Sequence, residues 1–431
     1  MKLWQKQNTS VSEIIEKFTV GKDNEFDMLL AKYDVQGSIA HVTMLGDVGL
    51  MTKEESGEAV EALKQIADEI EKGIFKIEEG VEDIHSQVEL LLTKRIGETG
   101  KKIHSGRSRN DQVAVDIKLF LKNEITIIKN GVKDLFELLL QQSVKYKEDL
   151  LPGYTHLQLA MPSSFGLWFG AYAESLIDDL EMLAAAYAVT NKNPLGSGAG
   201  YGSSFPLDRK KTTALLGFAN LNYNSVYAQM ARGKTEKLVA MGISSLAATL
   251  SKLSMDCCLY LNQNFDFISF PSHLTTGSSI MPHKKNPDVF ELIRAKSNRI
   301  QAIPNELTLL LNNLPSGYHR DLQLTKEILF PALSELKICM EMMMLMLSNI
   351  EVKKDLLSDK KYKYLFTVEA INEKVNKGVS FRDAYSKVGD QVEKNEFTFD
   401  QKKLIHTHIG SISNLGNDHI QEQMRLVLEK F

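Results

Sequence analysis

Residues 111–147 read DQVAVDIKLFLKNEITIIKNGVKDLFELLLQQSVKYK, with no proline and a single glycine. Their apolar residues recur at intervals of three and four, as in Ile117, Leu121, Ile125, Ile128, Val132, Leu135 and Leu139. This spacing places them on one face of an α-helix. Such a helix would extend roughly 55 Å at 1.5 Å per residue. We therefore expect a fold organised around helices much longer than the globular average of about a dozen residues.

Four more stretches predict long helices, over about 163–190, 225–264, 287–313 with a kink at Pro304, and 324–350. Together with 111–147 they indicate a long helical bundle. The stretch 225–264 carries small residues such as Gly242, Ser245 and Ala248 beside its apolar stripe, so it should be buried all round. One chain's bundle supplies too few neighbours to cover it. We therefore expect an oligomer.

The chain on either side of these helices differs in character. Residues 1–105 predict short helices and loops, of which 53–72 is the clearest helix. From Lys353 onward the sequence is more polar and contains several glycines. We predict an all-α protein of three domains: an N-terminal helical domain over 1–108, a central long-helix bundle over 109–353, and a small C-terminal helical domain over 354–431.

Composition narrows the function classes. The 431 residues include 43% hydrophobic and 25% charged side chains, as in ordinary globular proteins. A net charge of −4 gives no electrostatic case for binding nucleic acid or an anionic membrane surface. Three cysteines indicate free thiols in a reducing compartment rather than a disulfide framework. The N-terminus lacks the apolar core of a signal peptide, and no membrane span is expected, so we expect a cytoplasmic protein.

One polar loop, TTGSSIMPHKKNPD at 275–288, stands out between two predicted helices. Asn286 followed by Pro287 indicates a helix N-cap and first helical position. Serines, lysines and backbone N–H groups in such a loop can surround an anion. The alternative interpretation is an ordinary surface loop before a helix.

Three other polar stretches adjoin the long helices. HSGRSRNDQ at 104–112 places two arginines at a helix N-terminus, which suits a carboxylate, although solvated arginines at an ordinary cap remain the alternative. GYTHLQ at 153–158 places His156 between two helices, where it could exchange a proton near neutral pH or be purely structural. PSGYHRDLQLTK at 315–326 could place Tyr318, Gln323 and Lys326 on one side, or be a plain polar helix start.

Two further features of the sequence could suggest a nucleotide-binding or metal site, but their residue spacing does not fit one. The glycine-rich segment 191–206 lacks the Gly-Lys-Ser/Thr ending of a phosphate-binding loop and the G-x-G-x-x-G spacing of a dinucleotide-binding loop. We therefore interpret it as a flexible loop; if it has a function, it would act as a lid. His406 and His408 lack partners at zinc-ligand spacing. We expect neither a metal nor a cofactor.

The loop residues 277–286 match the pattern G-S-S-x-M-P-x-K-x-N, which resembles the signature of the fumarase/aspartase superfamily of lyases. The stretches at 104–112 and 318–326, with Gly37–His41 and Asp83–His85, resemble the argininosuccinate lyase family within it. The resemblance extends from about Phe18 to the C-terminus. It implies a homotetramer with a twenty-helix core and active sites built by three chains. It also implies anti β-elimination of argininosuccinate to arginine and fumarate, without metal or cofactor.

The resemblance also assigns site residues by motif position. His156 and Ser278 match the catalytic pair, with Ser278 favoured as base and His156 as acid, although the reverse remains open. Matches to positions that bind substrate are Asn110, Thr155, Tyr318, Gln323 and Lys326. Matches to the loops that handle carboxylates are Ser108, Arg109, Lys284 and Asn286. Glu291 matches an acidic residue that orients the catalytic histidine.

The chain departs from the family pattern in three places, one of which is a C-terminal domain that is shorter than usual. Gly21 stands where the family usually has a serine, and residues 227–234 replace an expected Asp-Arg-Asp triplet. Three alternatives to the argininosuccinate lyase prediction remain open. They are another lyase of the superfamily, above all one acting on adenylosuccinate, a catalytically silent structural protein on the same scaffold, and a helical interaction module.

Overall fold

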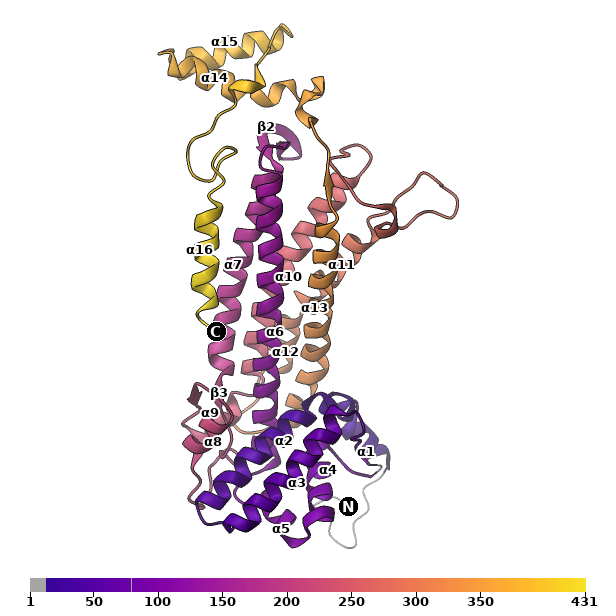
Figure 1. Ribbon diagram of the computed structural model, residues 1–431, viewed down its shortest axis with the longest axis vertical. Helices are drawn as coiled ribbons and strands as arrows, with labels where there is room; N and C mark the ends of the chain where they lie inside the picture. Colours follow the sequence, from indigo (N-terminus) through magenta and orange to yellow (C-terminus); the bar gives the residue numbers. More distant parts are fainter. Residues whose placement is uncertain (1–12, 79) are drawn as a thin grey trace.

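The computed structural model describes residues 13–78 and 80–431 (Figure 1). The N-terminal residues on which the signal-peptide argument rests lie outside this range. The molecule is elongated, with a bundle of long helices in the middle and smaller groups of helices at its two ends. The all-α prediction with a central bundle is confirmed.

The bundle is formed by six helices. Their bounds are α6 (Arg109–Lys145), α7 (Phe165–Thr190), α10 (Lys234–Leu261), α11 (Asp288–Ile300), α12 (Ile303–Leu310) and α13 (Thr325–Ser348). Helix α6 packs on α7 and α13, and α10 packs on α7, α11, α12 and α13. The predicted stripe from Ile117 to Leu139 lies in the buried core of this bundle.

The N-terminal helices lie at one end of the bundle, around the start of α6. They are α1 (Glu13–Val20), α2 (Asp23–Asp47), α3 (Lys53–Glu71), α4 (Ile84–Ile96) and α5 (Glu98–Lys101). Helices α2, α3 and α4 enclose a second apolar cluster that includes Val35, Leu63 and Val88. Helix α2 also packs on α6, which connects this layer to the bundle.

The remaining elements are short. They are helices α8 (Arg209–Leu215), α9 (Ser225–Met230), α14 (Thr367–Asn376), α15 (Phe381–Glu393) and α16 (Asn417–Leu428), and strands β1 (Leu150–Thr155), β2 (Gln158–Ser164), β3 (Lys192–Asn193), β4 (Asn220–Leu221), β5 (Ile268–Ser269) and β6 (Glu351–Val352). Strands pair as β1–β2, β3–β4 and β5–β6. Helices α14 and α15 lie beyond the β1–β2 hairpin, whereas α16 returns along α7 (Figure 1).

Two of the predicted long helices are interrupted. The expected helix over 225–264 breaks into α9 and α10 at Gly233, where φ is +74° and a Cβ atom would approach Leu311 to 2.3 Å. Only glycine tolerates both conditions. The expected kink at Pro304 is instead a break between α11 and α12, so Pro304 lies in the first turn of α12, where its missing N–H is harmless.

Two other expectations for local structure are wrong. Residues 1–105 contain one long helix, α2, which spans 25 residues and is buried on most sides. A helix buried all round has no single apolar face to reveal it in sequence. The glycine-rich segment predicted to be a flexible loop is packed in its first half, where residues 193–198 are buried.

The predicted burial of α10 holds only in part for a single chain. By length and composition this helix could cross a membrane, but half of its most apolar window is buried inside the bundle. Met241, Ala248 and Met255 are exposed and follow one another at seven-residue intervals along it. Residues seven apart lie on the same helical face. An apolar stripe on α10 therefore faces outward.

Candidate active site

A cavity of about 430 Å³ opens where the N-terminal helices meet the start of α6. Six of the predicted site residues line it: Ser108, Arg109, Asn110, Tyr318, Gln323 and Lys326. The first three come from the N-terminus of α6. Tyr318 precedes the 3₁₀ turn Arg320–Leu324, Gln323 lies in that turn, and Lys326 lies in the first turn of α13. The structure therefore brings together two polar stretches more than two hundred residues apart in sequence.

The start of α6 is fixed by a capping box. The Ser108 hydroxyl accepts a hydrogen bond from the N–H of Asn110 (3.3 Å), and the N–H of Ser108 donates to the Asp111 carboxylate (2.7 Å). The other Asp111 oxygen accepts from the N–H groups of Gly196 and Gly198. Burial raises the pKa of Asp111 to about 6 despite these donors. The same carboxylate thus fixes the helix start and the glycine-rich segment.

The Arg109 guanidinium is already engaged inside the chain. It contacts Glu82 (3.1 Å) and Asp83 (2.8 Å) and donates to the Ser86 hydroxyl (2.9 Å). Three partners in a partly buried setting give this guanidinium a defined orientation. A substrate carboxylate at Arg109 would have to share it with Glu82 and Asp83.

Gln323 and Tyr318 also line the cavity. The Gln323 side-chain amide donates to the carbonyl oxygens of Thr19 and Val20 at the end of α1, both at 3.1 Å. Its oxygen accepts from the Arg320 guanidinium (3.3 Å). Tyr318 is partly exposed. Gln323 therefore closes α1 over the cavity in this structure.

Lys326 forms a deeply buried ionic contact in the cavity. Its side chain is only 3% exposed and contacts Asp27 (2.6 Å) and Asp23. Burial lowers the pKa of Lys326, but the two carboxylates outweigh that effect and raise it. Lys326 is therefore a permanently charged group inside the cavity.

Thr155 and His156 lie elsewhere, at the tip of the β1–β2 hairpin. Thr155 pairs with Gln158, which leaves His156 and Leu157 as a two-residue turn. Both turn residues have positive φ, +54° and +58°, a conformation usually taken by asparagine and glycine. Both side chains are exposed, Leu157 by 77%. The hairpin, which sequence reasoning had treated as a loop, projects the imidazole beyond the end of the bundle.

Ser278, Lys284 and Asn286 lie on the loop before α11, which projects from the side of the bundle (Figure 1). The Ser278 hydroxyl accepts from the N–H groups of Met281 (3.1 Å) and Ile280 (3.3 Å). Asn286 closes the neck of the loop, because its N–H donates to the Thr276 carbonyl (2.8 Å) and its amide to Gly277. The prediction that Asn286 caps the helix is wrong: α11 begins at Asp288, one residue after Pro287.

Within one chain these groups do not meet. The cavity adjoins the first residues of α6, whereas the hairpin starts five residues after its last. The 37 residues of α6 separate the two sites by roughly 55 Å at 1.5 Å per residue. Glu291 is exposed in the first turn of α11. A single chain therefore holds the cavity without the predicted catalytic pair.

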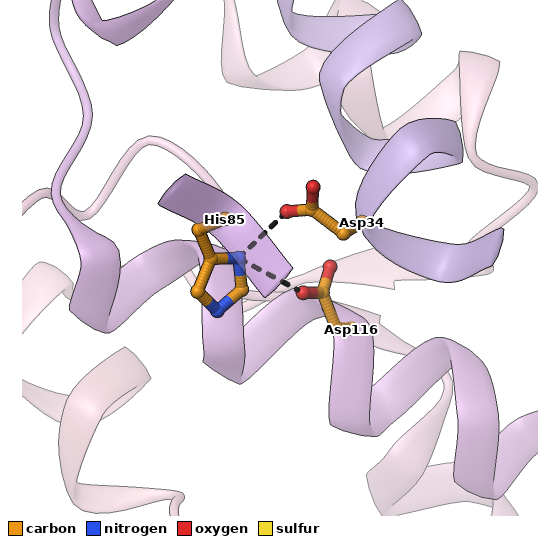
Figure 2. A group of neighbouring side chains, drawn as sticks. All are labelled: Asp34, His85 and Asp116. Atoms are coloured by element: carbon orange, nitrogen blue, oxygen red, sulfur yellow. Dashed lines mark hydrogen bonds and ion pairs between the residues drawn. The ribbon is translucent and has the colours of Figure 1, made fainter. Parts of the chain in front are cut away.

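A buried ionic cluster lies beside the cavity (Figure 2). His85 Nδ1 is 2.7 Å from Asp34 and 3.6 Å from Asp116, and all three side chains are almost fully buried. Their ligand atoms lie within 4.8 Å of one another, as in a metal site. Burial lowers the pKa of His85, but Asp34, with Asp83 and Asp116, raises it to about 9. At this pKa the imidazole is protonated at neutral pH and lies beside the two carboxylates, so we describe the cluster as an ion triad.

This triad predicts a pH dependence of stability. The pKa of His85 is about 9 in the folded protein and 6.5 in its ordinary state, so the triad stabilises fully below about pH 6.5, and the effect is lost as pH rises through 9. The difference corresponds to roughly 3 kcal/mol. Urea unfolding of the wild type should show the loss. In His85→Gln, which cannot titrate there, the pH profile should lack this loss and so differ from that of the wild type; identical pH profiles would contradict this interpretation.

Sequence reasoning missed several residues that line the cavity, notably Asp23, Asp27, Glu82 and Arg232. Asp23 and Asp27 are one helical turn apart on α2, the helix that sequence reasoning did not find. Arg232 lies within the stretch that replaces the expected Asp-Arg-Asp triplet. The four-residue spacing of the two aspartates was a usable signal once α2 was known.

Comparisons with known proteins add independent findings. A family model described as Lyase matches residues 6–302. An argininosuccinate lyase from Bacteroides thetaiotaomicron is 57% identical over 430 residues, which cover 100% of this chain and 96% of that relative. One from Thermotoga neapolitana is 39% identical over 390 residues, covering 90% of this chain and 98% of that relative.

Solved structures agree on the fold. An EDDS lyase variant with bound fumarate superposes with a TM-score of 0.76 at 21% identity, covering 98% of this chain and 91% of its own. A class II fumarase from Schistosoma mansoni gives 0.70 at 15% identity, covering 94% and 91%. The fold expected from the sequence resemblance is confirmed.

Proposed function

Because this chain belongs to the argininosuccinate lyases of the fumarase/aspartase superfamily, we propose that it cleaves argininosuccinate at a site completed by neighbouring subunits. The products are arginine and fumarate, and the reaction is the last step of arginine biosynthesis. The chain is thus a carbon–nitrogen lyase. The observation that carries the proposal is the match, over the whole chain, to relatives of this activity at 57% identity.

The proposed chemistry is an anti β-elimination. Ser278 removes a proton from the succinyl carbon beside a carboxylate, and the electrons of that C–H bond become the double bond of fumarate. The bond between the neighbouring carbon and the guanidinium nitrogen breaks, and its electron pair leaves with that nitrogen. His156 supplies the proton that the nitrogen requires. The step needs stabilisation of a dianionic intermediate, for which Lys284 and the N–H groups of the loop are suited.

The surroundings of Ser278 support its role as the base. A neutral hydroxyl is a poor base, and donors at its oxygen favour the alkoxide. Two backbone N–H groups already point at this oxygen. The ammonium of Lys284 would add positive charge when the loop closes over substrate. The opposite assignment, with His156 as base, remains the second candidate.

The geometry of the hairpin supports His156 as the proton donor. Two residues with side chains held at positive φ cost of order 1–3 kcal/mol each, a strain that a surface turn without function has no reason to keep. The strained turn presents the imidazole outward. It can therefore enter the cavity of another subunit.

We further propose a homotetramer with a twenty-helix core, in which three chains contribute to each site. The exposed stripe of Met241, Ala248 and Met255 on α10 supports this assembly, since apolar surface on a central helix needs a partner. We also propose domain boundaries after residues 108 and 353, and a cytoplasmic location. The roles of Thr155, Asn286 and Glu291 are proposed on the same basis.

The purified protein tests the proposed function directly. Incubation with argininosuccinate should release fumarate, followed by its ultraviolet absorbance, and arginine in equal amount. Adenylosuccinate should give no fumarate. Turnover of adenylosuccinate instead would favour the sister lyase activity, and failure with both substrates at high enzyme concentration would favour a structural protein on this scaffold.

A further inference from the structure

The inner end of the cavity contains an imbalance of charge. Asp23 and Asp27, one turn apart on α2, share the single ammonium of Lys326. Asp27 is as deeply buried as Lys326, whereas the Asp23 side chain is 22% exposed. Two carboxylates for one ammonium leave a surplus negative charge. Asp23 is the carboxylate that a cationic ligand group can reach.

Arg232 lines the same cavity and carries an unmet donor. The residue is 6% exposed; its Nε donates to Glu236 (3.2 Å) and its Nη2 to the Leu322 carbonyl (3.2 Å). Its Nη1 is buried and has no acceptor in the parts of the chain that the structure describes. A buried donor without an acceptor is unfavourable. A ligand oxygen at this position would remove that deficit.

The two features are neighbours. Burial and the charge of Asp27 raise the pKa of Asp23, and among the groups that lower it again is the guanidinium of Arg232. A reachable carboxylate and an unsatisfied guanidinium on one cavity wall complement a group that carries an ammonium beside a carboxylate. The α-amino-acid end of a free amino acid has this pair of charges.

We propose that Asp23 and Arg232 clamp the α-ammonium and the α-carboxylate at the arginine end of the substrate. The inference rests on the proposed function and specifies how its substrate is oriented. The ammonium takes the place of Lys326 at Asp23, while Asp27 keeps Lys326 paired. The carboxylate accepts from Nη1 of Arg232. This clamp fixes the end of the substrate that does not react, so that the succinyl end extends toward the groups of the other subunits.

Equilibrium binding to the assembled enzyme tests the clamp with three probes. Arginine carries both charges, 5-guanidinopentanoate lacks the ammonium, and agmatine lacks the carboxylate. Each missing charge removes a charge-assisted hydrogen bond, so the wild type should bind each analogue at least about tenfold more weakly than arginine. Equal affinity for the three probes, or no detectable arginine binding, would overturn the clamp.

Variants assign the two halves of the clamp. Asp23→Asn should lose the preference for arginine over 5-guanidinopentanoate and keep the preference over agmatine. Arg232→Gln should show the reverse. Glu25→Gln, which changes an exposed carboxylate on the same helix outside the cavity, should leave all three affinities unchanged. If Asp23→Asn weakens all three probes equally, Asp23 is structural and the assignment is wrong.

Wild-type turnover keeps this test separate from the proposed function. An enzyme that releases fumarate from argininosuccinate, yet binds the three probes alike, refutes the clamp and leaves the lyase activity intact. A protein that ranks the probes as expected, yet releases no fumarate, retains the clamp and refutes the reaction. If Arg232→Gln fails to fold, the relative affinities of the wild type and of Asp23→Asn for the three probes still test the clamp.

Discussion

Replacing Ser278 with alanine is expected to lower kcat for argininosuccinate by at least roughly a hundred-fold, the scale of lost general-base catalysis. The hydroxyl has no contact in the chain other than with the N–H groups of its own loop among the interactions that the structure records. Its loss should therefore leave folding and assembly unchanged. The KM should change little, because Ser278 is proposed to act on the reacting carbon, whereas the groups proposed to bind the arginine end line the cavity.

The measurement is fumarate release at saturating substrate, with circular dichroism to check the fold. Ser279→Ala provides a matched control, because it removes a neighbouring hydroxyl from the same loop and should lower kcat by less than about tenfold. If Ser278→Ala turns over at nearly the wild-type rate, Ser278 leaves the mechanism and His156 becomes the candidate base.

Mixing two inactive variants is expected to restore activity when their substitutions lie at opposite ends of α6. His156→Ala removes the proposed acid at the hairpin, and Lys326→Met removes the cation in the cavity. If each site takes these two groups from different chains, random mixed assembly leaves about one quarter of the sites with both native groups. Activity should rise from near zero to about one quarter of the wild type.

Co-expression with two affinity tags and tandem purification isolates the mixed oligomers for this assay. The matched control is His156→Ala mixed with Thr155→Val. Both substitutions lie on one hairpin, so every site receives one or the other and no activity should return. Equal recovery in the two mixtures, or none in the first, would show that the hairpin and the cavity do not combine across subunits as proposed.

Sequence periodicity predicted the bundle because long helices with one apolar face leave a clear pattern, as α6 does. The same reasoning missed α2, since burial on most sides removes the contrast between faces. It also merged α9 and α10, because a single glycine is tolerated inside a helical pattern. Only the tertiary contact between Gly233 and Leu311 shows that the chain must turn there.

The sequence motifs predicted several of the residues that line the cavity, but not which residues form hydrogen bonds and ion pairs with them. Local motifs identified the arginine at 109 and the glutamine at 323. Their partners in the structure, Glu82 and the end of α1, are set by how α2 packs against α6 and α4. Asp23 and Arg232 matched no motif, and their place in the site is evident only from the structure, in which both line the cavity. The all-round apolar pattern of residues 225–264 predicted an oligomer, but it did not indicate which residues of other chains would join the site.

The turn at His156 and Leu157 has a consequence for protein engineering. Positive φ at both positions means that glycine would relieve strain in each, so a programme that ranks substitutions by thermostability would select both. At 157 that choice should raise the melting temperature harmlessly. At 156 it would remove the imidazole, so if His156 is the proposed acid, a library screened for heat resistance alone would enrich inactive enzyme.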